Sequence, residues 1–149
     1  MTADHYDSLE TRSGDEREAA LFAALTTQLT HAKAHSTAYG ELLAEVDPAS
    51  VTDRASLAQV PVTRKSDLVE RQAANPPLGG VNAQPVADLP RLFASPGPIY
   101  EPQGDGADYW RFGRALYAAG FLKGDIVHNC FAYHFTPAVF LFHAADKAI

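Results

Sequence analysis

The chain changes its pattern at residues 91–102, which read RLFASPGPIYEP. Arg91–Ala94 is a short apolar run typical of a buried strand, and a proline-rich turn signal follows it directly. Three further elements are predicted after it: a helix from Asp105 or Asp108 to Gly120, a second buried strand over 125–130, and an apolar helix opened by Thr136-Pro137. Strand, helix, strand and helix in this order predict an α/β fold with the first βαβα units of a parallel sheet.

The residues before this stretch are predicted to be a helical lead. Leu21, Phe22, Leu25 and Leu29 recur at helical spacing between Asp15 and His35, with Ser13 or Asp15 available as the N-cap. A short helix over 39–45 is expected next, and then a helix capped by Thr63 that runs to about Gln72 with Leu68 and Val69 facing inward. These patterns divide the chain into a mobile lead-in over 1–14, a helical region over 15–72, a linker over 73–90 and an α/β region over 91–149.

Composition narrows the classes of partner. The 149 residues carry a net charge of −6 with no cluster of Lys or Arg, so nucleic acid and anionic membrane surfaces are not expected partners. The single Cys130 rules out an internal disulfide framework and leaves no Cys/His set for a structural zinc, so no metal site is predicted. The N-terminus lacks a signal-like apolar run, and a cytoplasmic location is the simplest expectation.

The stretch after the first strand is the first candidate binding site, because ligands of α/β proteins bind at the carboxyl ends of strands. Its residues are Ser95, Pro96, Gly97, Pro98, Ile99, Tyr100 and Glu101. The alternative is a proline-rich connector without a ligand. Proline has no backbone N–H to donate to an anion, and Glu101 places a negative charge beside any phosphate.

The second candidate site is aromatic. Phe131, Tyr133 and Phe135 follow the predicted second strand, and His134 stands among them. An apolar aromatic wall suits a phenyl ring or a short aliphatic chain, although ordinary core packing explains the same residues. His134 is a candidate contact for a carboxylate, or it satisfies a local hydrogen bond.

Several motifs in order resemble the phenylacetate–CoA ligase family, a branch of the AMP-forming acyl-CoA synthetases. The element Leu-x-x-x-Pro-x-Thr-x-Lys-x-Asp-Leu is matched over 57–68, and Ala-Ala-Gly-x-x-x-Gly-Asp-x-Val is matched over 118–127. The resemblance runs from about Leu25 to Ile149. It implies that the α/β region is incomplete relative to the large N-terminal domain of that family.

The resemblance also implies a reaction. Such enzymes use ATP and Mg²⁺ to convert a carboxylic acid into an acyl-adenylate, and CoA then gives the thioester. The stretch 95–101 takes the place of the family's ATP loop, Ser-Ser-Gly-Thr-Thr-Gly-Lys-Pro, but in an ungapped alignment only Ser95, Gly97 and Pro102 match it. Residues 131–135 take the place of the wall that holds the acid.

No catalytic residue is assigned, because the family's adenine-binding motif, metal-binding acid and adenylation lysine are expected beyond Ile149. The chain alone is therefore predicted to be inactive. A small complete domain, acting as a non-catalytic binding module or a homologue that no longer uses ATP, is the alternative. The expected partner is a small carboxylic acid, and association through exposed apolar surface, including a homo-oligomer, stays open.

Overall fold

The structure is a computed structural model that describes residues 5–149. The chain forms two compact units, which we describe separately. Arg12–Asp88 make up the helical unit, and the residues up to Thr11 together with Leu89–Ile149 make up the hairpin unit. Residues 1–4 of the predicted lead-in lie outside the described residues.

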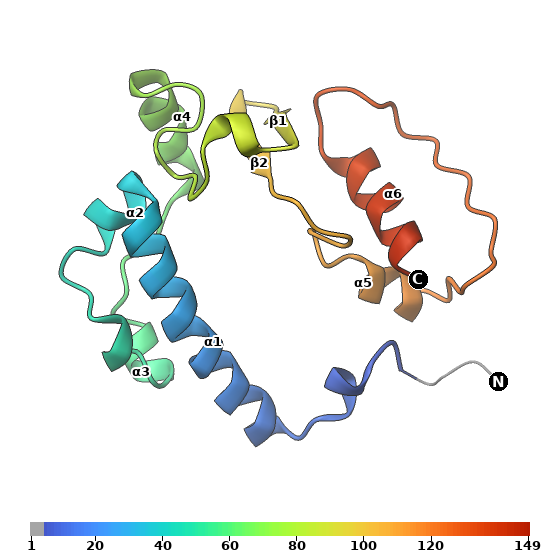
Figure 1. The fold of residues 1–149 in the computed structure, drawn as a ribbon, viewed down its shortest axis with the longest axis horizontal. Coiled ribbons are helices and arrows are strands. Elements are labelled where there is room, and N and C mark those ends of the chain that lie inside the picture. Colours follow the sequence, from blue (N-terminus) through green and yellow to red (C-terminus); the bar gives the residue numbers. More distant parts are fainter. Residues whose placement is uncertain (1–4) are drawn as a thin grey trace. The chain divides into compact units, whose positions relative to one another are not determined.

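The helical unit consists of short helices around one long helix, drawn from blue to green in Figure 1. Its elements are α1 (Gly14–His35), α2 (Thr37–Leu42), the 3₁₀ turn η2 (Pro48–Ser50), α3 (Arg54–Leu57), α4 (Lys65–Ala74) and the 3₁₀ turn η3 (Val86–Asp88). Its buried hydrophobic residues are Phe22, Ala38, Leu43, Val51 and Leu78.

Side chains cap the N-termini of helices in this unit. The Ser13 hydroxyl accepts the Glu16 N–H at 3.2 Å, and the Glu16 carboxylate accepts the Ser13 N–H at 2.7 Å, which forms a capping box at the start of α1. Hydrogen bonds from the Ser13 backbone and side chain hold the pKa of Glu16 below its ordinary value of 4.5. Asp53 and Ser56 make the same arrangement at α3. The predicted Ser13 cap of α1 is therefore confirmed.

Polar bonds also tie distant parts of the helical unit together. Arg54 donates two hydrogen bonds to the Glu18 carboxylate, at 2.7 and 2.9 Å, and these lower the pKa of Glu18. The Ser36 hydroxyl donates to the Gly80 carbonyl at 2.8 Å, next to a turn in which Gly79 and Gly80 both have positive φ. A Cβ on Gly79 would lie 2.7 Å from the Arg71 side chain, so this close approach requires glycine.

The hairpin unit contains both strands of the described chain. Its elements are the 3₁₀ turn η1 (Ser8–Thr11), β1 (Arg91–Ser95), β2 (Ile99–Gln103), α5 (Gly113–Ala118) and α6 (Ala138–Ala148). α6, red in Figure 1, packs beside α5. The buried hydrophobic residues of the hairpin unit are Phe93, Ile99, Leu116, Val139 and Ala145. The segment before α1 joins this unit, because Asp7 pairs with Arg114 and the Tyr6 ring lies edge-on to Tyr117 at 5.6 Å.

The predicted α/β class is confirmed, but the strand arrangement within it differs from the prediction. β1 and β2 pair antiparallel, with Ser95 opposite Ile99 and Arg91 opposite Gln103. The second strand thus follows the first after three residues, Pro96–Pro98, instead of after a crossover helix. Gly97, with φ of 143°, allows this sharp reversal, which a parallel sheet would not contain.

The prediction of a strand over 125–130 is wrong for the described chain. The segment has no regular secondary structure, and the Ile126 side chain is fully exposed. An apolar run becomes a strand only when another strand accepts its backbone hydrogen bonds, and the sheet of the described residues ends with β1 and β2. A turn precedes the segment, in which the Asp125 carboxylate accepts the Leu122 N–H at 2.8 Å.

Helix boundaries also shift from the predicted ones. α4 begins after Arg64 without a side-chain cap, so Thr63 is not its N-cap, and Gln72 is buried while Val69 is 40% exposed. α5 starts only at Gly113, since the Asp108 carboxylate accepts the N–H groups of Phe112 and Gly113 at 2.9 and 3.0 Å. The N-cap of α6 is Pro137, which makes no side-chain hydrogen bond, so Thr136 is not the cap and Pro137 is not the first helical residue.

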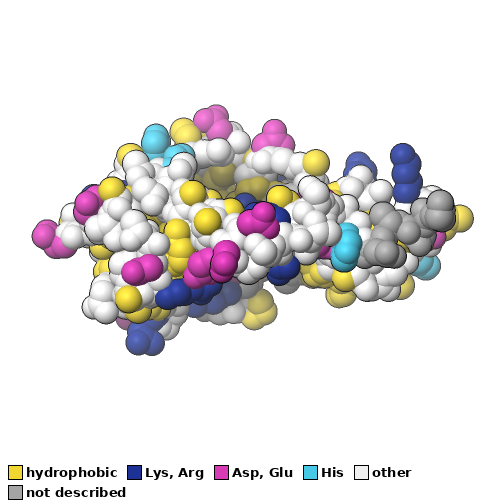
Figure 2. All heavy atoms as spheres, turned by 90° about the horizontal axis from the view of Figure 1, so that it is seen from below, with side chains coloured by type: hydrophobic (Ala, Val, Ile, Leu, Met, Phe, Trp, Pro, Cys, Tyr) yellow, Lys and Arg dark blue, Asp and Glu magenta, His cyan; other side chains and the backbone are white. Residues whose placement is uncertain are grey.

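Surface properties agree with the charge pattern of the sequence. Acidic and basic side chains are interspersed on the face shown in Figure 2, without a large area of one sign. Among residues 5–149, none of the helices combines the length and the apolar character needed to cross a membrane.

Candidate functional site

The predicted phosphate-loop counterpart is the turn of the β-hairpin. Ser95 ends β1, Ile99 begins β2, and the Ser95 hydroxyl donates to the Ile99 carbonyl at 3.2 Å. The three turn residues between them are exposed, whereas Ile99 is 5% exposed and belongs to the core. The seven predicted residues are therefore contiguous in space, but only part of them reaches the surface.

Tyr100 and Glu101 point to opposite faces of the hairpin, because successive side chains alternate in a strand. Glu101 lies opposite Phe93 in the register and shares its face, while Tyr100 lies opposite Ala94 on the other face. Tyr100 is 42% exposed. These two residues therefore do not form one binding surface with the turn.

The turn offers few groups that bind an anion. Of its three residues only Gly97 has a backbone N–H, because Pro96 and Pro98 have none. A phosphate nest needs several successive N–H groups aimed at one point. Arg91, the basic residue of the hairpin, lies at its other end with its guanidinium 4.7 Å from the centroid of the Phe140 ring.

The predicted aromatic site lies against α6. Phe131 stacks on Phe142 with ring centroids 5.4 Å apart, and Tyr133 lies edge-on to Phe140 at 5.3 Å. Both rings still expose more than half of their surface, and Phe135 is 76% exposed. His134 is exposed, and its backbone N–H donates to the Ala132 carbonyl at 3.1 Å. The segment thus presents an open aromatic face supported from behind by the helix.

A backbone hydrogen bond joins the aromatic segment to β1, one residue before the first predicted site. The Ala94 N–H, on the edge of β1 that faces away from β2, donates to the Phe135 carbonyl at 2.9 Å. Asn129 holds the start of the same segment, since its amide donates to the Val139 carbonyl at 3.3 Å and its oxygen accepts the Phe131 N–H at 3.1 Å. No sequence pattern marks Asn129 as a site residue, because its role depends on α6 lying beside it.

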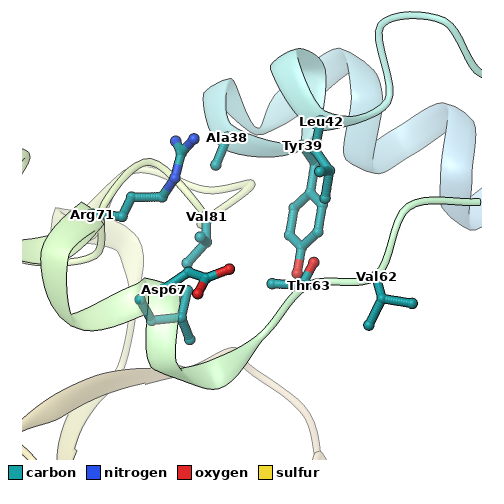
Figure 3. Close-up of a pocket in the computed structure, with 9 residues that line it drawn as sticks. Ala38, Tyr39, Leu42, Val62, Thr63, Asp67, Arg71 and Val81 are labelled. Atoms are coloured by element: carbon teal, nitrogen blue, oxygen red, sulfur yellow. The ribbon is translucent and has the colours of Figure 1, made fainter.

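A separate pocket of about 160 Å³ lies within the helical unit (Figure 3). Its walls come from α2, from the segment before α4, from α4 itself and from the residue after the Gly79-Gly80 turn. The lining residues are Ala38, Tyr39, Leu42, Val62, Thr63, Asp67, Leu68, Arg71 and Val81. No sequence motif indicates this pocket, because the lining residues come from separate segments that meet only in the folded unit.

Neither site has the residues of a metal centre. Across residues 5–149, no three His, Cys, Asp or Glu side chains lie close enough together to hold a metal ion. Cys130 is exposed and unpaired with any other cysteine, since it is the only one in the chain.

Comparison with known proteins gives a fold and no sequence family. No protein-family model matches the chain, and no curated protein matches it significantly. Similar solved structures include those of an acyl-CoA ligase. One of them, 2-hydroxyisobutyryl-CoA ligase in the postadenylation state in complex with 2-HIB-AMP, has a TM-score of 0.82 to this chain at 23% identity.

Two further structures of the same ligase agree. One, with 2-HIB-AMP and CoA in the thioesterification state, has a TM-score of 0.81 at 23% identity, and the other, with R3-HIB-AMP, has 0.78 at 24%. The match covers 91–93% of this chain but only 30–31% of the ligase. The chain therefore has the fold of about one third of an acyl-CoA ligase.

Proposed function

We propose that this chain forms part of an adenylate-forming acid–CoA ligase. The observation that carries the proposal is the fold match over nine-tenths of the chain to a ligase solved with an acyl-adenylate and with CoA. In this reaction a carboxylic acid attacks the α-phosphate of ATP and releases pyrophosphate, and the CoA thiolate then displaces AMP. Two groups of residues in the hairpin unit would serve it.

The aromatic face of Phe131, Tyr133 and Phe135 is the part that would contact the acyl group. Exposed rings supported by α6 offer an apolar surface of the kind that binds a phenyl ring or a short branched chain. We propose an aromatic carboxylic acid, as in the phenylacetate–CoA ligases that the sequence resembles. His134, exposed in the same segment, would contact the carboxylate.

The hairpin turn would lie at the nucleotide, but its residues fit a phosphate poorly. Gly97 supplies the only N–H of the three turn residues, and Glu101 adds a negative charge to the hairpin. The described residues also bring together no acidic cluster for Mg²⁺. The described residues therefore supply no step of the ATP chemistry, and we expect residues 1–149 alone to be inactive.

This poor fit favours a second candidate function, a binding module that no longer uses ATP. Pyrophosphate exchange with the intact gene product, in the presence of phenylacetate, 2-hydroxyisobutyrate or no acid, separates the two. Exchange that depends on the acid supports the ligase and contradicts the idea that the turn is disabled. No exchange with any acid favours the module.

A graft of the turn makes the test sharper. The variant P96S/P98T/E101K restores two hydroxyl groups and the lysine of the ligase loop, and it leaves the buried Ile99 unchanged. If the turn alone limits the reaction, the graft should raise exchange by about tenfold or more, because each donor to a developing charge contributes a few kcal/mol. A graft as inactive as the parent, with unchanged thermal stability, would count against the ligase.

A further inference from the structure

Oxygen atoms of three side chains line one side of the pocket in the helical unit. In Figure 3 the Asp67 carboxylate points across the pocket toward the hydroxyl end of Tyr39, which lies beside Thr63. The Asp67 carboxylate accepts a hydrogen bond from the neighbouring Ser66 hydroxyl at 3.0 Å, which leaves room for further donors on its two oxygens. The polar side of the pocket therefore combines one carboxylate with two hydroxyl groups, which can accept as well as donate hydrogen bonds.

Arg71 does not cancel the charge of this carboxylate, because its guanidinium is engaged elsewhere. It pairs with the Glu41 carboxylate at 3.0 Å and donates to the Gly79 carbonyl at 3.4 Å. In Figure 3 its guanidinium points away from the Asp67 carboxylate. The Asp67 carboxylate therefore faces the pocket without a salt bridge to Arg71, although Arg71 also lines the pocket.

The rest of the wall is apolar and the space is small. Leu42, Leu68 and Val81 line it together with the ring of Tyr39. The volume of about 160 Å³ is close to the roughly 150 Å³ of an engineered protein cavity that holds one benzene molecule. The pocket therefore suits a ligand of a few heavy atoms with a short hydrocarbon part and one positive charge.

We propose that this pocket binds a small primary alkylammonium ion. The ammonium group donates its three hydrogens to the Asp67 carboxylate and to the hydroxyls of Thr63 and Tyr39. The alkyl chain packs against Leu42, Leu68 and Val81. The site lies wholly within the helical unit, so it is independent of the ligase function proposed for the hairpin unit.

The test is a titration of the ¹⁵N-labelled chain with n-butylammonium chloride, followed by amide chemical shifts, at low ionic strength. n-Butanol serves as the neutral probe of equal chain length. Saturable shifts centred on Tyr39, Thr63 and Asp67 are expected with the ammonium ion and not with the alcohol. Equal shifts with both probes, or no shifts at these residues, would overturn the proposal.

Two variants identify the groups that bind. D67N removes the charge and should weaken binding by about tenfold or more, while Y39F keeps the ring but loses one acceptor and should weaken it by about threefold. D88N makes the same charge change at the exposed Asp88, outside the pocket, and should bind like the parent. Because Asp67 lies in the first turn of α4, Y39F keeps the test decisive if D67N lowers the stability of the helix. Parent-like affinity in both variants would refute the assignment.

Discussion

In the helical unit, side chains that are neighbours in the sequence cap the starts of the helices. The hairpin unit is instead held together by aromatic rings from segments far apart in the sequence. Ser13 with Glu16 and Asp53 with Ser56 form capping boxes in the first. In the second, Phe93 contacts Trp110 and Phe140, with ring centroids 6.3 and 5.3 Å apart. Local signals set the helix starts of the first unit, whereas the rings that pack the second come from segments far apart in the sequence.

The two units also differ in the apolar surface they leave open. In the hairpin unit, five exposed large side chains lie in the one segment from Ile126 to Phe135, with Ile126 fully exposed and Phe135 76% exposed. Those of the helical unit are single aliphatic residues spread over several elements, such as Leu21 and Val69. Scattered apolar residues are ordinary on a protein surface, but a contiguous aromatic group indicates a surface that another molecule or segment covers.

The largest expected effect is a loss of stability in the hairpin unit alone, which tests whether the two units have separate cores. Phe93→Ala should destabilise the hairpin unit by about 3–5 kcal/mol, because Phe93 is 2% exposed and packs on two other rings. Amide hydrogen exchange should show faster opening around Leu116 and Val139, with α1 unchanged. Phe93→Leu is the milder control. Equal loss of protection in both units would show that they unfold as one.

The reciprocal change is Leu78→Ala in the helical unit. Leu78 is 1% exposed, so its truncation should cost about 2–5 kcal/mol and loosen α1 and α4 while leaving the hairpin protected. Leu21→Ala removes an equal volume from a side chain that is 43% exposed, and we expect it to be close to neutral. If both variants lower the urea midpoint equally, the assignment of the core is wrong.

A smaller effect tests the local signals. Ser13→Ala removes the hydroxyl that accepts the Glu16 N–H and should cost about 1 kcal/mol of helical-unit stability. Ser8→Ala changes an exposed serine outside the helical unit and should have almost no effect. Thermal melting followed by far-UV circular dichroism compares the two. A parent-like melt for Ser13→Ala would argue that packing, and not the cap, fixes the start of α1.

The smallest effect is the response to mild acid. Hydrogen bonds to the carboxylates hold the pKa values of Glu16 and Asp53 below their ordinary values of 4.5 and 3.8. The folded form therefore binds protons less readily than the unfolded one, so this stabilisation is present above about pH 4.5 and is lost as the pH falls through the lowered values. Urea midpoints of the helical unit should fall in this range, and Glu16→Gln should flatten the dependence.

The sequence predicts the features that depend on neighbouring residues better than those that depend on distant segments. The start of α1 is predictable because Ser13 and Glu16 are three residues apart and need no other element. The buried face of α4 is not, since Gln72 rather than Val69 is covered by elements that the helix itself does not specify. Strand formation over 125–130 fails for a related reason, because an apolar run does not determine whether a partner strand is present.

The candidate site shows the same limit. The turn at 96–98 and the aromatic run at 131–135 are each contiguous in sequence, so residue types alone are enough to select them. The hydrogen bond from the Ala94 N–H of β1 to the Phe135 carbonyl is not predictable in this way, because a backbone bond carries no side-chain pattern. The pocket around Asp67 is not predictable either, because it exists only once separate segments have packed.

The segment between α5 and α6 has one further consequence, for digestion by proteases. Phe131, Tyr133 and Phe135 are all more than half exposed and lie outside any helix or strand. Chymotrypsin cleaves after such residues, and exposed irregular segments are its preferred targets. A cut in this segment breaks the chain between the hairpin and α6 while α1 to α4 stay whole. The fragments on a gel therefore record directly whether the aromatic face is open or covered.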